Sequence, residues 1–129
     1  MDKVKFQREY LINASKSILY NCLSTPSGLS EWFADDVNIR KDVYTFIWDG
    51  SEEDARLLTK KREEYVKFKW TETEDDEDDK SFFEMRIKID ALTGETALIV
   101  TDFAEEDEVE EATLLWDSQV DSLKRILGS

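Results

Sequence analysis

The stretch DEVEEATLLWDSQVDSLKRILG, residues 107–128, determines the architecture that we expect for the whole chain. Its apolar side chains recur at intervals of three or four residues, which is the spacing of one face of an α-helix. They are Val109, Ala112, Trp116, Val120, Leu123 and Leu127. Leu114, Leu115 and Ile126 are expected to widen this stripe. A helix this apolar needs a large partner surface, which the rest of the chain must provide.

The charges at the two ends of this stretch also favour a helix. Acidic residues crowd its start, and Lys124 and Arg125 lie near its end. This order complements the helix dipole. Gly128 is suited to end the helix.

Length and composition limit the classes of function. At 129 residues we expect one domain, residues 1–129. The net charge of −14 argues against nucleic acid and against an anionic membrane surface as partners. With a single cysteine (Cys22) and no histidine, a disulfide within the chain is impossible, and most zinc sites and every nucleophile–histidine arrangement are excluded. We therefore expect no metal and no cofactor, and a cytoplasmic location, since no stretch resembles a signal peptide or a membrane span.

The N-terminal stretch, residues 3–12, alternates between apolar and polar side chains, as a half-buried strand does. Its apolar side carries Val4, Phe6, Tyr10 and Ile12. Arg8 falls on the same side. An inward arginine extends its head to water or pairs with a carboxylate, and a contact with a ligand is the alternative.

Two short helices are predicted next. Ser15 is suited to cap the first, whose apolar face carries Ile18, Leu19, Cys22 and Leu23. Pro26 must end that helix by residue 24 or 25, and it opens a second helix capped by Thr25. The second helix is expected to present Leu29, Trp32 and Phe33.

From residue 37 to residue 103 the sequence predicts strands separated by polar turns. The expected strands are residues 37–40, 43–48, 53–61, 65–70, 82–91 and 95–103, with turns at Asp35-Asp36, Asp49-Gly50 and Thr93-Gly94. Residues 71–80 are almost all acidic and predict a solvated loop. Strand, two helices, further strands and a long helix indicate an α+β fold, in which a curved antiparallel sheet of about six or seven strands holds the C-terminal helix in its concave face.

Three phrases resemble the START-like helix-grip superfamily (SRPBCC), in particular bacterial proteins similar to the C-terminal domain of the activator of the Hsp90 ATPase. They are INAS at residues 12–15, LSTPSGLSEWF at residues 23–33, and the spacing of Trp116, Val120, Leu123 and Leu127. Leu115 stands where the family often has glycine. The resemblance implies a cavity between sheet and terminal helix, which various members use for lipids, aromatic products or hormones.

Large side chains at inward or junction positions are the candidates for lining such a cavity. They are Trp32, Phe33, Phe68, Trp70, Phe83, Met85 and Trp116, with Arg8 as a further candidate. Aromatic and methionine side chains suit an adaptable apolar pocket, but they can equally fill the core. Our leading hypothesis is a non-enzymatic domain that binds a small hydrophobic or aromatic ligand.

Other functions remain open at this point. The acidic surface could serve a protein-interaction module or a chaperone co-factor, and an exposed strand edge could form a dimer. A small cyclase or hydrolase-like enzyme would draw on Arg8, Tyr10, Thr101 and Asp102, but nothing in their spacing marks an acid–base pair. Weak calcium binding by residues 72–79 is an alternative to a solvated loop, although the run lacks the glycine and final glutamate of an EF-hand.

Overall fold

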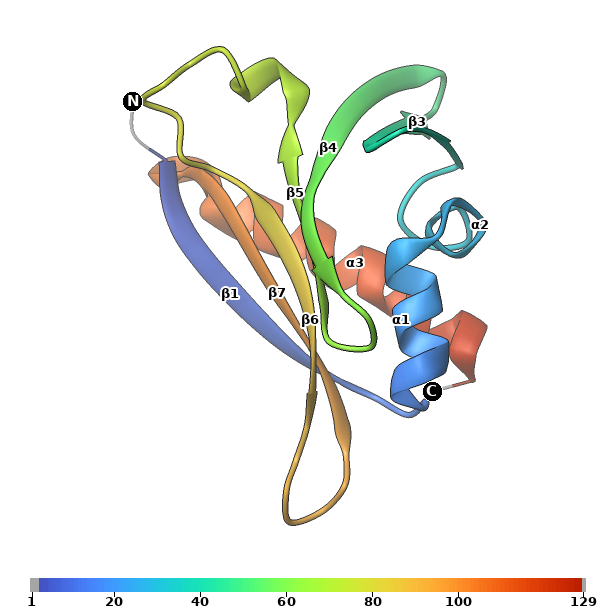
Figure 1. The fold of residues 1–129 in the computed structure, drawn as a ribbon. Coiled ribbons are helices and arrows are strands. Elements are labelled where there is room, and N and C mark those ends of the chain that lie inside the picture. The colour runs from blue at the N-terminus through green and yellow to red at the C-terminus, as the bar shows by residue number, and fades with distance from the viewer. Residues whose placement is uncertain (1–2, 129) are drawn as a thin grey trace.

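A computed structural model describes residues 3–128 as one curved antiparallel sheet with helices on its concave side (Figure 1). The strands are β1 (Lys3–Ile12), β2 (Asp36–Arg40), β3 (Val43–Trp48), β4 (Ser51–Lys61), β5 (Tyr65–Trp70), β6 (Phe83–Ile89) and β7 (Thr96–Glu105). The helices are α1 (Lys16–Ser24), α2 (Pro26–Leu29) and α3 (Val109–Leu127), with short 3-10 helices η1 (Thr71–Thr73) and η2 (Glu106–Glu108). The α+β helix-grip prediction is thus confirmed.

The strand order follows from short connections. Strands β2 to β7 pair consecutively, and β1 joins the free edge of β7, which gives the order β1-β7-β6-β5-β4-β3-β2. The paired register places Tyr10 opposite Leu98 and Ile12 opposite Thr96. A continuous sheet of seven strands curls because each strand twists, and α3 crosses the concave face that results (Figure 1).

Helix α3 packs against the sheet through the predicted stripe, but the stripe is narrower than expected. Trp116, Val120 and Leu123 are buried. Leu114 and Leu115 are 61% and 60% exposed, so the prediction that they widen the apolar face is wrong, as it is for Ile126 at 43%. The sheet covers only one side of the helix, and these three side chains lie on sides that it does not reach. Gly128 ends α3 with a φ of 70°, a left-handed conformation that glycine adopts without strain.

The α1–α2 corner forms as its capping residues predict. Ser15 Oγ accepts from the Ile18 backbone N–H at 3.2 Å, and Thr25 Oγ1 accepts from the Gly28 N–H at 2.9 Å. A Cβ at Gly28 would lie 2.3 Å from the Asn21 carbonyl oxygen, so only glycine allows the two helices to approach this closely. Ile18 is an exception to the expected apolar face, since it is 54% exposed.

The second helix is shorter than predicted. It ends at Leu29, and Trp32 and Phe33 lie in the turn that follows it rather than on its face. Both side chains are nevertheless buried. Asp36, expected in a turn, already pairs with Ile47 as the first residue of β2.

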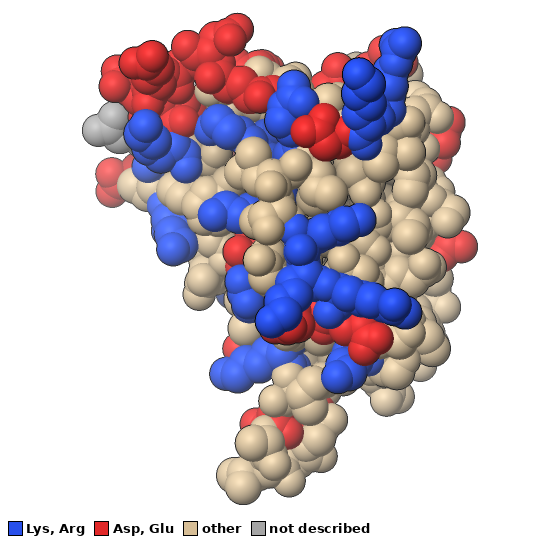
Figure 2. All heavy atoms as spheres, in the orientation of Figure 1, with Lys and Arg blue, Asp and Glu red and all other residues tan. Residues whose placement is uncertain are grey.

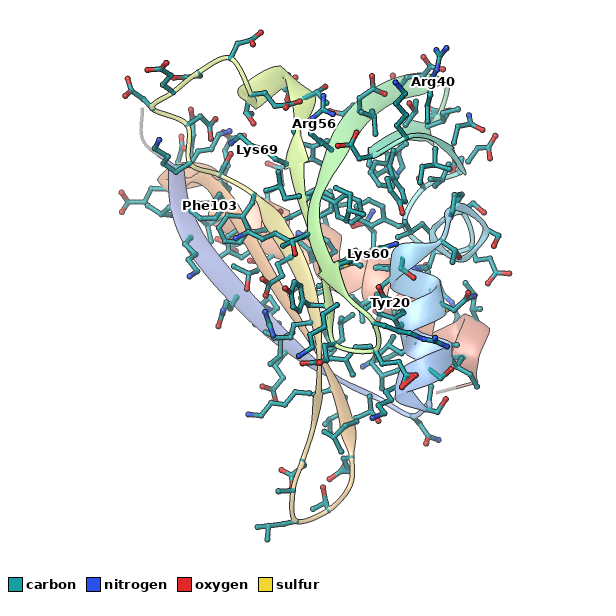
Figure 3. The ribbon with its side chains drawn as sticks, in the orientation of Figure 1. Tyr20, Arg40, Arg56, Lys60, Lys69 and Phe103 are labelled. Carbon is teal, nitrogen blue, oxygen red and sulfur yellow. The ribbon has the colours of Figure 1, made fainter. Side chains whose placement is uncertain are left out.

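The acidic loop between β5 and β6 is anchored at its end. Lys69 Nζ donates to the carbonyl oxygens of Asp79 at 2.9 Å and Ser81 at 2.8 Å, and Lys3 Nζ lies 2.9 Å from Asp79 Oδ2. Arg56, which is labelled with Lys69 in Figure 3, donates to Glu74 of this loop and to Asp42, each at 2.9 Å. Among the described helices, none is long and apolar enough to cross a membrane.

Candidate functional site

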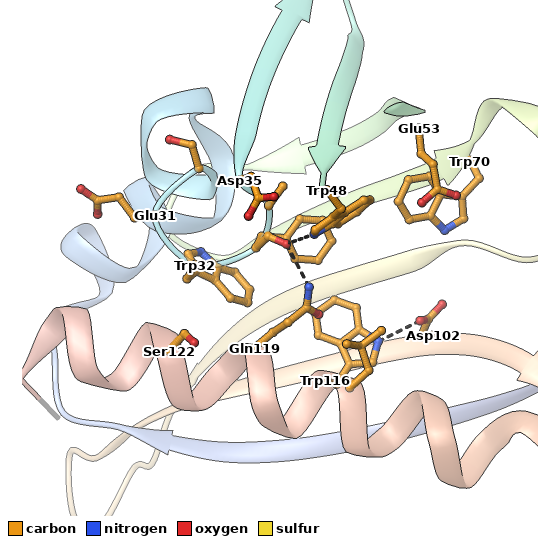
Figure 4. A pocket seen from close by; sticks show the side chains of 14 residues that line it. Glu31, Trp32, Asp35, Trp48, Glu53, Trp70, Asp102, Trp116, Gln119 and Ser122 are labelled. Carbon is orange, nitrogen blue, oxygen red and sulfur yellow. Dashed lines mark hydrogen bonds between the residues drawn. The ribbon is translucent and has the colours of Figure 1, made fainter. Parts of the chain in front are cut away.

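A pocket with a volume of about 870 Å³ lies between α3 and the turn that follows α2 (Figure 4). One wall is formed by residues 30–35 of that turn, and strands β3, β4, β5 and β7 each contribute one side chain, respectively Trp48, Glu53, Trp70 and Asp102. Helix α3 completes it with Leu115, Trp116, Gln119 and Ser122. Segments distant in sequence therefore meet here because the sheet curls around the helix.

All four tryptophans of the chain line this pocket, namely Trp32, Trp48, Trp70 and Trp116. Trp32 Nε1 donates to the Cys22 carbonyl oxygen at 2.9 Å, and Trp116 Nε1 donates to Asp102 Oδ2 at 2.8 Å. Trp70 is half-buried, and its ring centroid lies 4.9 Å from that of Phe83. The four indoles come from four different elements, so their convergence is a property of the tertiary fold.

Phe33 connects the walls of the pocket. Its carbonyl oxygen accepts from Trp48 Nε1 at 2.6 Å and from Gln119 Nε2 at 2.9 Å (Figure 4). Its ring also contacts the rings of Trp32 and Trp116, with centroids 5.4 and 5.6 Å apart. One residue of the turn is thereby bound to β3 and to α3 together.

Four carboxylates also line the pocket: Glu31, Asp35, Glu53 and Asp102. The first three are exposed at its rim. Asp102 lies deeper, and burial raises the pKa of its carboxyl group, partly offset by hydrogen bonds from Trp116 Nε1 and from the Phe103 N–H at 2.7 Å. The described lining residues include no lysine and no arginine.

The residues predicted for a cavity divide into two groups. Trp32, Phe33, Trp70 and Trp116 line the pocket. Phe68, Phe83 and Met85 do not line it, because they are fully buried in the sheet face beneath. Phe68 and Phe83 stack at a centroid distance of 5.0 Å. Core and pocket thus coexist, the first supporting the walls of the second.

Arg8 is not at the pocket. Its Nη2 lies 3.3 Å from Asp117 Oδ1 of α3, which is the carboxylate pairing expected for an inward arginine. Tyr10 donates to the same oxygen at 2.7 Å. The pKa of its hydroxyl is raised, mainly by burial and in addition by this hydrogen bond. Of the four polar residues considered for catalysis, only Asp102 lines the pocket.

Trp48 and Gln119 were not predicted from the sequence, and Asp102 was predicted only as an acid–base candidate. Trp48 shared the alternation of Tyr44 and Phe46, which predicts the inner face of the sheet, and this signal could have found it. No pattern in the sequence indicates that Gln119 reaches the Phe33 carbonyl, because that contact depends on how α3 is placed. A cluster of carboxylates does form at Glu105, Asp107 and Glu108, outside the acidic run considered for calcium.

Comparisons with known proteins agree with this architecture. The family model for the START-like superfamily domain matches residues 1–129. A solution structure of BfR322 from Bacteroides fragilis is 39% identical, with a TM-score of 0.67 over 98% of this chain and 92% of that one. The Aha1 dimer from Colwellia psychrerythraea (18% identity, TM-score 0.80, 96% of each chain) and MLL2253 from Mesorhizobium loti (15%, 0.78, 97% of each) share the fold. No curated protein matches the chain.

Proposed function

This chain belongs to the START-like superfamily, and we propose that residues 1–129 form a single START-like domain that binds a small hydrophobic or aromatic ligand between the sheet and α3. The observation that carries the proposal is the convergence of all four tryptophans on one pocket. Large aromatic side chains that only filled a core would be expected at buried positions throughout the sheet. Here Trp48 and Trp70 stay half-buried at the pocket wall.

The size and chemistry of the pocket support this function. A volume of about 870 Å³ falls within the range of small-molecule sites, about 300–1,000 Å³. Such sites combine apolar walls with a few polar groups that orient the ligand. We propose Trp32, Phe33, Trp70 and Trp116 as apolar contacts, together with Trp48. Phe68, Phe83 and Met85 support these walls from beneath.

The proposal is tested by binding measurements on purified protein. Native mass spectrometry of protein from its own host should show a reproducible small adduct, which solvent extraction then identifies. The Trp70→Ala variant should lose the adduct, because the half-buried indole forms part of the pocket wall. The variant should still fold, since this side chain is not fully buried in the core. Phe82→Ala removes a half-buried ring that packs on Phe103, outside the pocket, and should retain it. An adduct that survives Trp70→Ala would place the ligand elsewhere and contradict the proposal.

A second candidate is a protein-interaction module, which one observation favours. Leu114 and Leu115 are consecutive residues of α3 that are each more than half exposed, and Leu115 also borders the pocket. Contiguous exposed apolar surface marks protein-interaction sites. If this surface binds a partner, pull-down from the host should be lost in Leu114→Glu and retained in Trp70→Ala. If the partner is lost in Trp70→Ala and retained in Leu114→Glu, the pocket is favoured instead.

A further inference from the structure

We propose that the pocket is selective for an organic cation, a molecule that joins an apolar or aromatic body to an amine or ammonium group. This inference rests on the proposed function, because it names the chemical class of the ligand for the same site. Three features of the pocket carry it: its indole walls, its carboxylates and the absence of a cation among the residues that line it.

Indole rings are the first feature. The face of tryptophan attracts a cation more strongly than that of any other side chain. The rings of Trp48 and Trp70 have centroids 6.2 Å apart and are inclined by 57°, so they form two walls of one corner (Figure 4). Only the Trp48 indole of this pair donates its N–H within the described residues, at 2.6 Å to the Phe33 carbonyl. The corner is therefore held by a hydrogen bond on the Trp48 side and by ring packing on Phe83 on the Trp70 side.

The carboxylates are the second feature. None of the ion pairs among residues 3–128 includes Glu31, Asp35, Glu53 or Asp102. Seven other acids among residues 3–128 have a basic partner, as in Arg56–Glu74 and Arg86–Glu84, so it is the gathering of four unpaired acids at one pocket that distinguishes this site. Four negative charges with no cation between them attract a positive ligand and repel an anionic one.

Asp102 gives the strongest indication of where the positive charge belongs. Asp102 is half-buried, and a carboxylate withdrawn from water is costly unless a cation or several hydrogen bonds compensate it. Both groups that donate to Asp102, Trp116 Nε1 and the Phe103 N–H, are neutral. Each carboxylate oxygen has a second lone pair, so Asp102 can also accept from a ligand ammonium. Burial raises the pKa of Asp102 by more than its two hydrogen bonds and the charge of Lys3 lower it, and a bound cation would add the compensation that is still lacking.

Many of the basic residues of the chain lie on another surface. Figure 2 shows lysine and arginine gathered across the convex face of the sheet. There Lys67 lies 4.0 Å above the ring of Phe82 and Arg86 lies 4.4 Å from that of Tyr65. These cation–ring pairs show the same chemistry in use with the chain's own cations. Arg125 reaches the rim of the pocket, where its Nη2 donates to Ser122 Oγ at 3.1 Å, but no described lysine or arginine lines the pocket itself, so a cation beside the indoles would come from the ligand.

The test uses three probes with one apolar body: 4-phenylbutylamine, 4-phenylbutanol and 4-phenylbutyrate. At pH 7 the amine is protonated, the alcohol neutral and the acid ionised. Isothermal titration calorimetry at low ionic strength should show the amine binding at least tenfold more tightly than the alcohol, and the acid most weakly. Added salt should reduce the preference for the amine.

Two variants then distinguish the effect of the pocket carboxylates on amine binding from the effect of the net charge of the protein. Glu53→Gln and Asp102→Asn should each reduce the amine's advantage severalfold and leave alcohol binding in place. Glu95→Gln removes the same charge from the β6–β7 hairpin, which projects away from the rest of the molecule (Figure 1), and should change nothing. If Glu95→Gln weakens amine binding as much as Glu53→Gln does, the preference comes from the net charge and the inference fails.

The outcomes also distinguish this inference from the function beneath it. If the alcohol binds as tightly as the amine, and Trp70→Ala abolishes both, the pocket binds ligands but not cations in particular. The proposed function then stands and the inference is overturned. If none of the three probes binds at millimolar concentration, both fail.

Discussion

At Asp117, a single carboxylate connects α3 to two side chains of β1. Its Oδ1 accepts from the Tyr10 hydroxyl at 2.7 Å and lies 3.3 Å from Arg8 Nη2. Tyr10 is buried, so its hydroxyl depends on this acceptor, whereas the exposed Arg8 can return to water. The hydrogen bond to Tyr10 therefore contributes more than the ion pair, since exposed ion pairs contribute little.

Removing this carboxylate should destabilise the fold. Asp117→Ala leaves the buried Tyr10 hydroxyl without its partner, and we expect a loss of about 1–3 kcal/mol in the free energy of unfolding, measured by urea denaturation. Asp121→Ala, an exposed position on the same helix, is the control and should change stability by less than about 0.5 kcal/mol. Equal effects of the two substitutions would show that Asp117 does not hold α3 to β1.

At the scale of elements, the sequence predicts periodic segments well and side-chain surroundings less well. The strand over residues 3–12 and the helix caps at Ser15 and Thr25 follow from local patterns that the structure confirms. The exposure of Leu114 and Leu115 could not be predicted, because the width of a buried stripe depends on how much of the helix the sheet covers. Local patterns do not contain that information.

The pocket illustrates the same division. Trp70 and Trp116 were predicted to face inward from the alternation of a strand and the spacing of the helix, whereas Trp48 was not selected. The hydrogen bond between Trp116 and Asp102 could not be predicted, since it depends on where α3 crosses β7. Hydrophobic periodicity identifies which side chains face the interior. It does not indicate whether they close the space or leave it open.

The docking of α3 is tested by its central tryptophan. Trp116 is 5% exposed, and large-to-small substitutions of buried aromatics cost about 3–5 kcal/mol, so Trp116→Ala should destabilise the protein by that amount. Leu115→Ala, at the next position and 60% exposed, should have less than about 0.5 kcal/mol of effect. A cost below about 1 kcal/mol for Trp116→Ala, in the same denaturation experiment, would contradict the packing of this helix.

Across the whole molecule, acidic groups respond to their surroundings in two opposite ways. Burial raises the pKa of Asp102, and a hydrogen bond with Glu105 and its charge raise that of Glu108. Such groups bind protons more tightly in the folded state, so they favour folding increasingly as the pH falls from neutral toward their ordinary values of 3.8 and 4.5. A net charge of −14 adds repulsion that acid also relieves.

Asp79 acts in the opposite direction. Its carboxylate accepts from the hydroxyl of Ser81 and pairs with Lys3, which together hold its pKa well below the ordinary value of 3.8. A group whose folded pKa is depressed contributes stability above its unfolded pKa and loses it as the pH falls through the folded pKa. Asp79 therefore stabilises the protein at neutral pH and ceases to do so in strong acid.

These two effects predict a maximum of stability in mild acid. We expect the free energy of unfolding, from urea denaturation at several pH values, to rise as the pH is lowered from 7 toward about 4 and to fall below that. Asp102→Asn should reduce the increase in the free energy of unfolding between pH 7 and about 4, because it removes a group that destabilises the fold only when it is ionised. Asp79→Asn should reduce the decrease in the free energy of unfolding below about pH 4, because the carboxylate that stabilises the fold is already absent. If stability declined steadily from pH 7 downward, the buried state of Asp102 and the repulsion among the acids would not govern the acid response of the fold.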